Sequence, residues 1–360
     1  MLTGYQYLEQ KRTVALDFQN PASLAVFAGY IPVSGIKTTR AAYIQPRLDW
    51  KGLSIIPGFR QDHVNIQATD DTLAGLEAAG QDSSIHLKER TYSLGLAYDI
   101  VPKQLTLFAN YGQGFRPPSM EYQYFSNAGR IAGVPISTSP CPVGASCDDE
   151  YKVQRSENSE AGVNYFNNNL FNSQLPNNRV QLNSKATFFH IHTSNLINSA
   201  VVAGDPRSVA SQDGKEVRNG WEFENSLYYN NFYARAGYSR IAGRVTLPTQ
   251  AFPLYTVPGR TFNLTLGTRI GDEWDLYFTY RKVSERQVLD SQPPIYAFDT
   301  QDGYELFNAG VRWAPSRNLS LRLVAENLGD KFYNLDGGFA GTLGLPGPGR
   351  NIKFYTELTY

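Results

Sequence analysis

The sequence predicts an all-β chain that folds as an antiparallel transmembrane β-barrel, and three observations support this fold class. Apolar and polar side chains alternate with a period of two along most of the chain, as in strands with one apolar face. Aromatic residues make up 13% of the 360 residues, although only 41% of the chain is hydrophobic. No stretch reaches the ~20 apolar residues of a membrane helix, whereas barrel strands show lipid only every second residue.

Alternation defines each predicted strand in turn. Leu94, Leu96 and Tyr98 share one face of their segment, and the small or polar residues Ser93 and Asp99 share the other. The same rule predicts fourteen strands, at residues 2–11, 39–50, 53–67, 89–101, 105–116, 158–167, 179–192, 216–229, 232–244, 260–270, 274–285, 304–313, 318–327 and 350–360.

The connections between these strands alternate in length. Short connections are predicted at residues 51–52, 102–104, 230–231, 271–273 and 314–317, with one longer exception at 168–178. Long connections are predicted at residues 12–38, 68–88, 117–157, 193–215, 245–259, 286–303 and 328–349. Short turns at one end and long loops at the other are typical of a bacterial outer-membrane barrel.

A soluble antiparallel sandwich or barrel is the alternative, because its strands also alternate. Two features favour the membrane. The apolar faces carry aromatic residues at their ends, as an interfacial girdle requires. The charged residues of many strands fall on the opposite face, which is a wet lumen in a membrane barrel; they are Arg47, Asp49, Arg60, Asp62, Asp275, Arg281, Arg322, Glu326, Lys353 and Glu357.

Charge and termini limit the partners and the compartment. The chain has 33 basic and 33 acidic residues, so no surplus positive charge suits a phosphate backbone, and nucleic acid is not an expected partner. The opening residues 1–13 lack the basic and apolar segments of a secretory signal. The N-terminus is therefore expected to be cytosolic, processed, or internal to a longer protein.

Both cysteines, Cys141 and Cys147, lie in the Pro-, Gly- and Ser-rich stretch 137–149. We predict a disulfide that closes a small loop in an oxidising compartment, with two unpaired thiols as the alternative. Zinc is poorly supported because no histidine lies between Phe115 and Glu160.

Five segments resemble the TonB-dependent outer-membrane receptors, which import scarce nutrients such as iron chelates and haem. They are residues 53–62 (LSIIPGFRQD), 111–119 (YGQGFRPPS), 157–165 (ENSEAGVNY), 326–333 (ENLGDKFY) and the glycine-arginine segment 347–360 that leads into a terminal strand. Their order and their spacing to the C-terminus are more specific than any one of them. Gly329 and Tyr360 depart from the family pattern, which often has an aromatic residue and a terminal phenylalanine at these places.

The resemblance implies a 22-stranded barrel preceded by a plug domain and a short box that engages TonB. Neither is visible in the sequence, so residues 1–360 are expected to be the C-terminal barrel part of a receptor, with the plug absent. The implied partners are outer-membrane lipid and lipopolysaccharide, the TonB complex through a missing N-terminal region, and an iron chelate. No cofactor of the protein itself is expected.

The predicted function is uptake of an iron complex, either a ferric siderophore or haem, bound by the extracellular loops. No catalytic constellation is visible, so the chain is not expected to be an enzyme. The alternative is a passive, porin-like outer-membrane channel. A plug domain encoded upstream would support the receptor, and a signal peptide directly before Met1 would support the channel.

The candidate ligand-binding residues are aromatic and cationic, because ferric chelates are large and often anionic. They are Arg116, Tyr122, Tyr124, Phe125 and Arg130, with His86 as a substitute for the loop histidine of haem receptors, since residues 117–151 contain none. For each aromatic residue the alternative is a place in the interfacial girdle.

His190 and His192 form a second candidate site, for haem or a metal ion. They share one face of their strand, and if Phe189 and Ile191 face lipid the two histidines point into the lumen. The alternative is a pair of luminal histidines that are hydrogen-bonded to their neighbours.

Overall fold

The structure is a computed structural model that describes residues 1–14, 33–70, 73–74, 84–117, 130–131, 134–135, 153–170, 180–198, 211–246, 251–254, 257–290, 297–335 and 346–359. In these residues one antiparallel sheet of 16 strands dominates. Among the described residues, no helix is long and apolar enough to cross a membrane.

Fourteen strands of the described chain follow one another across the sheet in sequence order. They are β1 (Leu2–Val14), β2 (Val33–Gln45), β4 (Leu53–Ala68), β5 (Ser84–Val101), β6 (Leu105–Arg116), β9 (Gln154–Asn167), β10 (Val180–Asn198), β11 (Ser211–Tyr229), β12 (Phe232–Thr246), β14 (Thr261–Ile270), β15 (Trp274–Val283), β18 (Tyr304–Ser316), β19 (Leu319–Glu326) and β20 (Asn351–Leu358).

Six short strands accompany this path. β3 (Leu48–Trp50) pairs with β4, and β13 (Ala251–Pro253) pairs with β12. Two small hairpins stand apart from the main sheet, and they consist of β7 (Arg130–Ile131) with β8 (Val134–Pro135), and β16 (Arg286–Asp290) with β17 (Ala297–Gln301). β3 lies inside the predicted strand 39–50, and the other five lie in predicted long connections, where the sequence analysis placed no strand.

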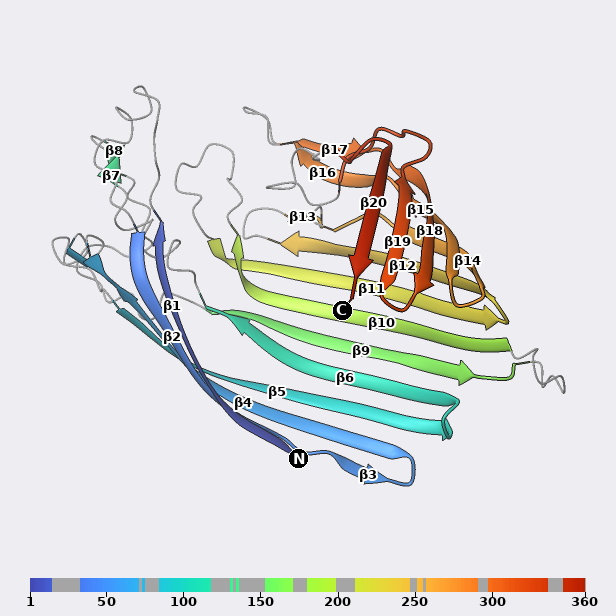
Figure 1. The fold of residues 1–360 in the computed structure, drawn as a ribbon. Coiled ribbons are helices and arrows are strands. Elements are labelled where there is room, and N and C mark those ends of the chain that lie inside the picture. Colours follow the sequence, from blue (N-terminus) through green and yellow to red (C-terminus); the bar gives the residue numbers. More distant parts are fainter. Residues whose placement is uncertain are drawn as a thin grey trace.

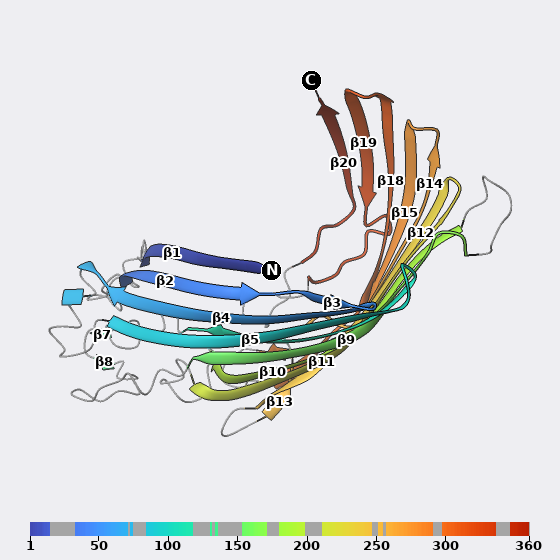
Figure 2. The same cartoon turned by 90° about the horizontal axis from the view of Figure 1, so that it is seen from below.

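The main sheet curls into a deep trough (Figures 1 and 2). Its two edges are β1 and β20, which are not paired with each other in the described part of the chain. Figure 2 shows these edges apart, near the N and C marks. The prediction of an antiparallel barrel wall with fourteen strands is confirmed, whereas the 22-stranded barrel and the absent plug stay predictions.

Tight turns join the strands at one end of the sheet, which we call the turn end. Lys51 and Gly52 have φ values of 43° and 84°, and Asn230 has 50°, the positive values that two-residue hairpins need. The long connections leave from the opposite end, the loop end. Outer-membrane barrels have short periplasmic turns and longer extracellular loops, so the fold predicted from the sequence would place the loop end toward the outside of the cell.

The two faces of the sheet differ as the sequence predicted. Along β5 the side chains of Tyr92, Leu94, Leu96 and Tyr98 are exposed, and the residues between them are less so. We call this the outward face; exposed Trp50, Phe188, Leu266, Phe278, Leu323 and Phe354 continue it on other strands. The inward face carries predicted luminal charges, which pair as Arg47–Asp49, Arg60–Asp62 and Lys353–Glu326.

Several strands extend further toward the loop end than predicted. β5 begins at Ser84 rather than at residue 89, β11 begins at Ser211 rather than 216, and β10 continues to Asn198 rather than 192. The predicted strand 39–50 is divided, because β2 ends at Gln45 before Pro46, which has no N–H to donate to a ladder.

Candidate functional site

At the loop end, β2, β4 and β5 continue beyond the apolar band of the outward face. The rings of Phe59 and Tyr92, with centroids 5.4 Å apart, mark the edge of this band. Beyond them the outward residues of β4 are Gln61, His63, Asn65 and Gln67. These polar residues do not suit a hydrocarbon environment, so this part of the wall stands outside the membrane core.

The inward face of the same region carries a small apolar cluster. Val64, Ile66, Ala68 and Ile85 are buried there, with Ile66 at 0% exposure. The ladder between β5 and β6 ends at Ser93 and Gly112, and beyond it Phe115 packs against the cluster. The cluster therefore holds the end of β6 against the extended part of β4 and β5.

Lys37 of β2 lies beside this cluster, in register with Ile66. Its side chain is half-buried, and burial lowers the pKa of Lys37 below its ordinary value. The positive charge of Arg116, at the end of β6, lowers the pKa of Lys37 further. Both residues lie on the inward face, so we refer to them as the inner cation pair.

Carboxylates near the inner cation pair already have partners. Asp62, only 2% exposed, accepts hydrogen bonds from Arg60 at 2.7–3.1 Å. Glu89 forms an ion pair with Arg155 at 2.8 Å. In the part of the chain that the structure describes, neither Lys37 nor Arg116 has a carboxylate partner. An acidic group in the lumen would stabilise the charge of Lys37 and give both cations a partner.

The structure places only part of the predicted loop site. Arg116 lies at the end of β6, and Arg130 lies in β7, where its backbone alone is described. The remaining residues predicted in this loop lie outside the described residues; they are Tyr122, Tyr124, Phe125, Cys141 and Cys147. Their roles, including the disulfide, stay predictions.

Lys37 was missed because the sequence assigned it to the long connection 12–38. The structure starts β2 at Val33, so Lys37 is a strand residue on the same face as Thr39, Ala41 and Tyr43. The contrast between apolar and polar residues did not mark it, because Lys37 and Thr38 are both polar.

The four histidines of the chain all lie on the outward face. His86 is an exposed strand residue of β5 on the side of Tyr92, rather than a loop residue at the mouth. His63 shares the outward side of β4 with Phe59. His190 and His192 follow Phe188, which is 55% exposed.

The condition under which His190 and His192 would point into the lumen is therefore not met. Phe189 faces inward, where its ring lies over Gly220 of the neighbouring strand. His190 Nδ1 lies 2.6 Å from Asn219 Oδ1, an ordinary hydrogen bond between neighbours. Among the described residues no group of three or more His, Cys, Asp or Glu side chains is arranged to hold a metal ion.

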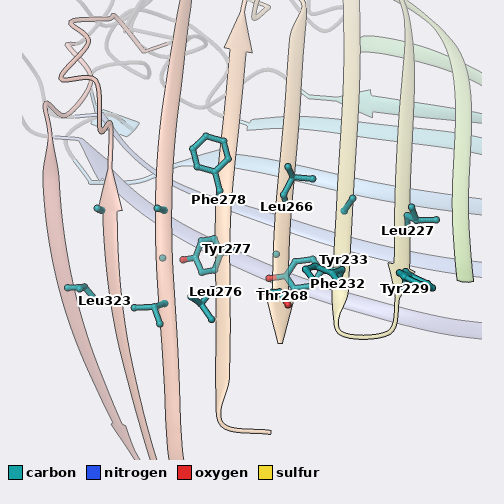
Figure 3. A pocket seen from close by; sticks show the side chains of 16 residues that line it. Leu227, Tyr229, Phe232, Tyr233, Leu266, Thr268, Leu276, Tyr277, Phe278 and Leu323 are labelled. Carbon is teal, nitrogen blue, oxygen red and sulfur yellow. The ribbon is translucent and has the colours of Figure 1, made fainter. Parts of the chain in front are cut away.

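A large apolar hollow lies elsewhere, on the outward face of β11 to β19 (Figure 3). Its volume is about 860 Å³, and Leu227, Leu266, Phe278 and Leu323 stand around it. All four side chains are exposed members of the apolar band. The hollow is thus a depression in the lipid-facing surface, and it holds no charged residue that would orient a polar ligand.

Known proteins resemble the chain over nearly its whole length. A family model described as TonB dependent receptor-like, beta-barrel, matches residues 2–328. The chain is 25% identical over 390 residues to the TonB-dependent heme receptor A of Haemophilus influenzae (strain 86-028NP), and the match covers 98% of this chain and 50% of that protein. The chain thus spans about half the length of this curated relative.

Solved structures show the same fold. The apoprotein form of the FrpB iron transporter from Neisseria meningitidis (F5-1 variant) matches with a TM-score of 0.72 and 16% identity, covering 99% of this chain and 53% of that one. The copper transporter OprC matches with a TM-score of 0.71 and 16% identity, again over 99% and 53%. At these identities the likeness concerns the fold alone.

Together, the match to residues 2–328, the fourteen-stranded antiparallel wall and its apolar outward band give one assignment. Proteins of this kind are receptors and transporters of the outer membrane rather than enzymes. The chain is an outer-membrane protein and belongs to the TonB-dependent receptor β-barrel family.

Proposed function

We propose that the protein takes up an iron complex, a ferric siderophore or haem, and that acidic groups of this complex bind the inner cation pair. The observation that carries the proposal is the position of Lys37 and Arg116, two cations without a carboxylate partner in the described chain, on the inward face at the loop end. A ligand that enters from outside meets this part of the lumen wall first.

The chemistry of iron complexes suits such a pair. Many siderophore complexes are anionic, and haem carries two propionate groups. Charge-assisted hydrogen bonds from lysine and arginine to such oxygens are the stronger kind, and arginine can engage a carboxylate with two parallel bonds. The name of the Haemophilus influenzae relative, a heme receptor, makes haem a natural first ligand to test.

The positions of the histidines refine the proposal. Because all four histidines of the chain lie on the outward face, this chain supplies no imidazole toward a ligand in the lumen. Recognition by this wall would therefore depend on the acidic periphery of the complex rather than on a histidine bound to the iron. The candidate residues Tyr122, Tyr124, Phe125 and Arg130 would add aromatic and cationic contacts from the loops.

Two further partners complete the proposal. Lipid and lipopolysaccharide would surround the outward face, whose apolar band ends in aromatic residues. Energy would come from TonB, on which the family depends. The contact with TonB would be made by the N-terminal region that the resemblance implies.

Growth under iron starvation tests the proposed function. A bacterial strain that lacks its own receptors would express the protein and receive haem or one of several ferric siderophores as its iron source. Growth that requires TonB on at least one iron complex is expected. Failure on every complex would contradict uptake of iron, and TonB-independent passage of unrelated small solutes would favour the porin-like channel instead.

A further inference from the structure

A row of arginines crosses the wall near the turn end. Arg269 of β14 is in register with Asp275 of β15, which is in register with Arg312 of β18. Arg312 is in turn in register with Arg322 of β19. We call Arg269, Arg312 and Arg322 the arginine row. It extends over four neighbouring strands, about 14 Å at the usual ~4.8 Å spacing of strands.

The arginine row faces inward at the level of an aromatic belt. The next residues toward the turns are Trp274 and Trp313, which are 40% and 37% exposed on the outward face. Their rings stack with centroids 5.5 Å apart, and such aromatic residues are typical of the membrane surface. Because adjacent strand residues point to opposite faces, the arginine row lies at the mouth of the lumen opposite to the inner cation pair.

Like charges lie side by side in this row. Arg312 and Arg322 are direct cross-strand partners, an arrangement that destabilises a sheet. Within the described residues, none of the three arginines forms an ion pair with a carboxylate. Places where a chain breaks a local rule of this kind without compensation are expected at functional sites.

The two acids beside the row have other neighbours. Asp275 accepts a hydrogen bond from the Tyr233 hydroxyl at 2.8 Å. Glu357 is in register with Ser320, whose hydroxyl accepts a hydrogen bond from Arg312 Nε at 3.0 Å. An anionic ligand would therefore meet guanidinium groups that have no carboxylate partner in the described chain.

Tyrosine rings lie along the wall beside the row. A Cβ at Gly310 or Gly267 would collide with the rings of Tyr277 and Tyr233, so these glycines leave the space that the rings occupy. Figure 3 shows both rings reaching toward the next strand. Tyr355, at the β20 end of the row, is 51% exposed. The rings thus cover the wall rather than fill the lumen, and they leave an aromatic surface next to the arginines.

An anion with a flat face suits this combination of residues. Guanidinium groups bind acidic oxygens with two parallel hydrogen bonds, and aromatic rings stack on flat partners. The Arg269 guanidinium already lies 5.9 Å from the centroid of the Tyr233 ring, a cation–π arrangement. An anion without a flat face would use the arginines alone.

We propose that the arginine row and Tyr277 form a second binding site in the lumen, for a flat complex with acidic groups at its edge. The inference rests on the proposed function, because an acidic iron complex released by the inner cation pair would meet this site before it leaves at the turn end. The occupant is a small flat anion, and an acidic polypeptide surface is the rival occupant.

Fluorescence anisotropy of the purified protein in detergent tests the site with pyrenetetrasulfonate, a flat and water-soluble anion, as the probe. The K37Q/R116Q variant removes the inner cation pair and is expected to retain one site for the probe. Adding R312Q/R322Q is expected to weaken this binding about 100-fold, since each arginine loses a charge-assisted hydrogen bond worth about tenfold. Tyr277→Leu should weaken binding of the probe about fivefold and leave binding of citrate, an anion without a flat face, unchanged.

A matched control removes two inward cations elsewhere. Arg47 is paired with Asp49, and Lys185 lies 5.7 Å from the centroid of the Phe108 ring. The R47Q/K185Q variant is expected to bind the probe like the wild type. Heat-modifiable migration on gels checks that all variants are folded.

Three outcomes would overturn the proposal. Citrate that binds the wild type as tightly as the probe would exclude recognition of a flat face, and this comparison needs no variant. Binding by R312Q/R322Q within about twofold of the R47Q/K185Q control would exclude the arginine row. Absence of any site in K37Q/R116Q would mean that a small flat anion does not occupy the row, as expected for the rival polypeptide.

The proposed function fails in a different way. Growth on iron complexes and binding by the inner cation pair are measured separately from the site that remains in K37Q/R116Q. Loss of the second site with growth intact leaves iron uptake standing, whereas growth on no iron complex contradicts uptake even if the flat probe binds the arginine row.

Discussion

The long strands β4 and β5 and the short strands β15 and β19 meet the membrane surface differently. β4 and β5 have 16 and 18 residues, whereas β15 and β19 have 10 and 8. On the short side the stacked rings of Tyr280 and Phe307, 5.2 Å apart, are followed at once by the paired charges of Lys282 and Glu305. On the long side, strand pairing continues well beyond the aromatic residues.

The difference shows how a barrel wall can present an outward and an inward surface beyond the membrane. A strand that stops near the membrane surface has a loop above it. A strand that continues keeps its alternation in water, so it presents one set of residues outward and another inward. Here the outward set includes Arg40, Lys88 and Arg90, and the inward set includes Lys37 and the apolar cluster of Ile66.

The largest expected effect tests the apolar band on which the comparison depends. Leu96→Arg places a charge near the middle of the outward face of β5 and is expected to cost about 3 kcal/mol, as at the midplane of other barrels. Asn110→Arg is the control, because Asn110 faces inward and already binds Glu160 at 2.6 Å. Urea unfolding in lipid vesicles, followed by tryptophan fluorescence, measures both. Equal losses would mean that the faces are assigned wrongly.

The next effect separates the clusters of the two regions. Ile66→Ala, at a fully buried site, is expected to cost about 2 to 3 kcal/mol, because the cavity adds to the lost transfer free energy. Leu306→Ala changes the cluster of Val283 and Tyr304 at the top of the short strands, where the side chain is 8% exposed, and is expected to cost less. The same unfolding assay ranks the two losses in the free energy of unfolding. A larger loss for Leu306→Ala would contradict the expectation that the cluster around Ile66 stabilises the wall more.

A smaller effect concerns ligand binding on the long side. Lys37→Gln and Arg116→Gln are each expected to weaken binding of an acidic iron complex about tenfold, because each removes a charge-assisted hydrogen bond. Lys282→Gln removes a cation from the short side and serves as the control. Titration by isothermal calorimetry measures the affinities. If esterifying the acidic groups of the complex leaves the wild-type affinity unchanged, the inner cation pair does not recognise them.

The smallest effect is expected at the ion pair of the short strands. Lys282 and Glu305 are 57% and 46% exposed, and exposed ion pairs contribute little once water and salt screen them. Lys282→Gln should change the free energy of unfolding by less than about 0.5 kcal/mol. A loss above 1 kcal/mol on the same scale would show that this region is held by charge more than by its aromatic rings.

Alternation predicted the fourteen strands well because each of them crosses the lipid with one apolar face. It fell short at the loop-side ends of β2, β5, β10 and β11, where pairing continues beyond the predicted bounds. In β2 the neighbouring residues Lys37 and Thr38 are both polar, so the contrast between the two faces fades although pairing continues. For this reason the sequence predicted only one residue of the inner cation pair. Arg116 ends a strand with clear alternation, whereas Lys37 lies where the alternation had faded.

The face of β10 on which His190 and His192 lie could not be predicted for a different reason. Phe188 and Phe189 are adjacent, so one ring must face lipid and the other must face the lumen, and a shift of one residue reverses every side chain of the segment. The choice is made by Gly220 on the neighbouring strand, which leaves room for the inward ring of Phe189. A contact between two strands cannot be read from the pattern of one strand alone.

The order of the strands also concerns how the wall can form. Every neighbour along the main path is the next long strand in the chain, from β1 to β20. Ladders across the turn end need only a short closure of the chain, and contacts of this local kind form quickly, whereas ladders such as β6 with β9 close a longer loop. The wall can grow one hairpin at a time, because each new strand pairs with the exposed edge of the previous one. The growing edge is therefore the part of the wall that most needs protection from pairing with another chain.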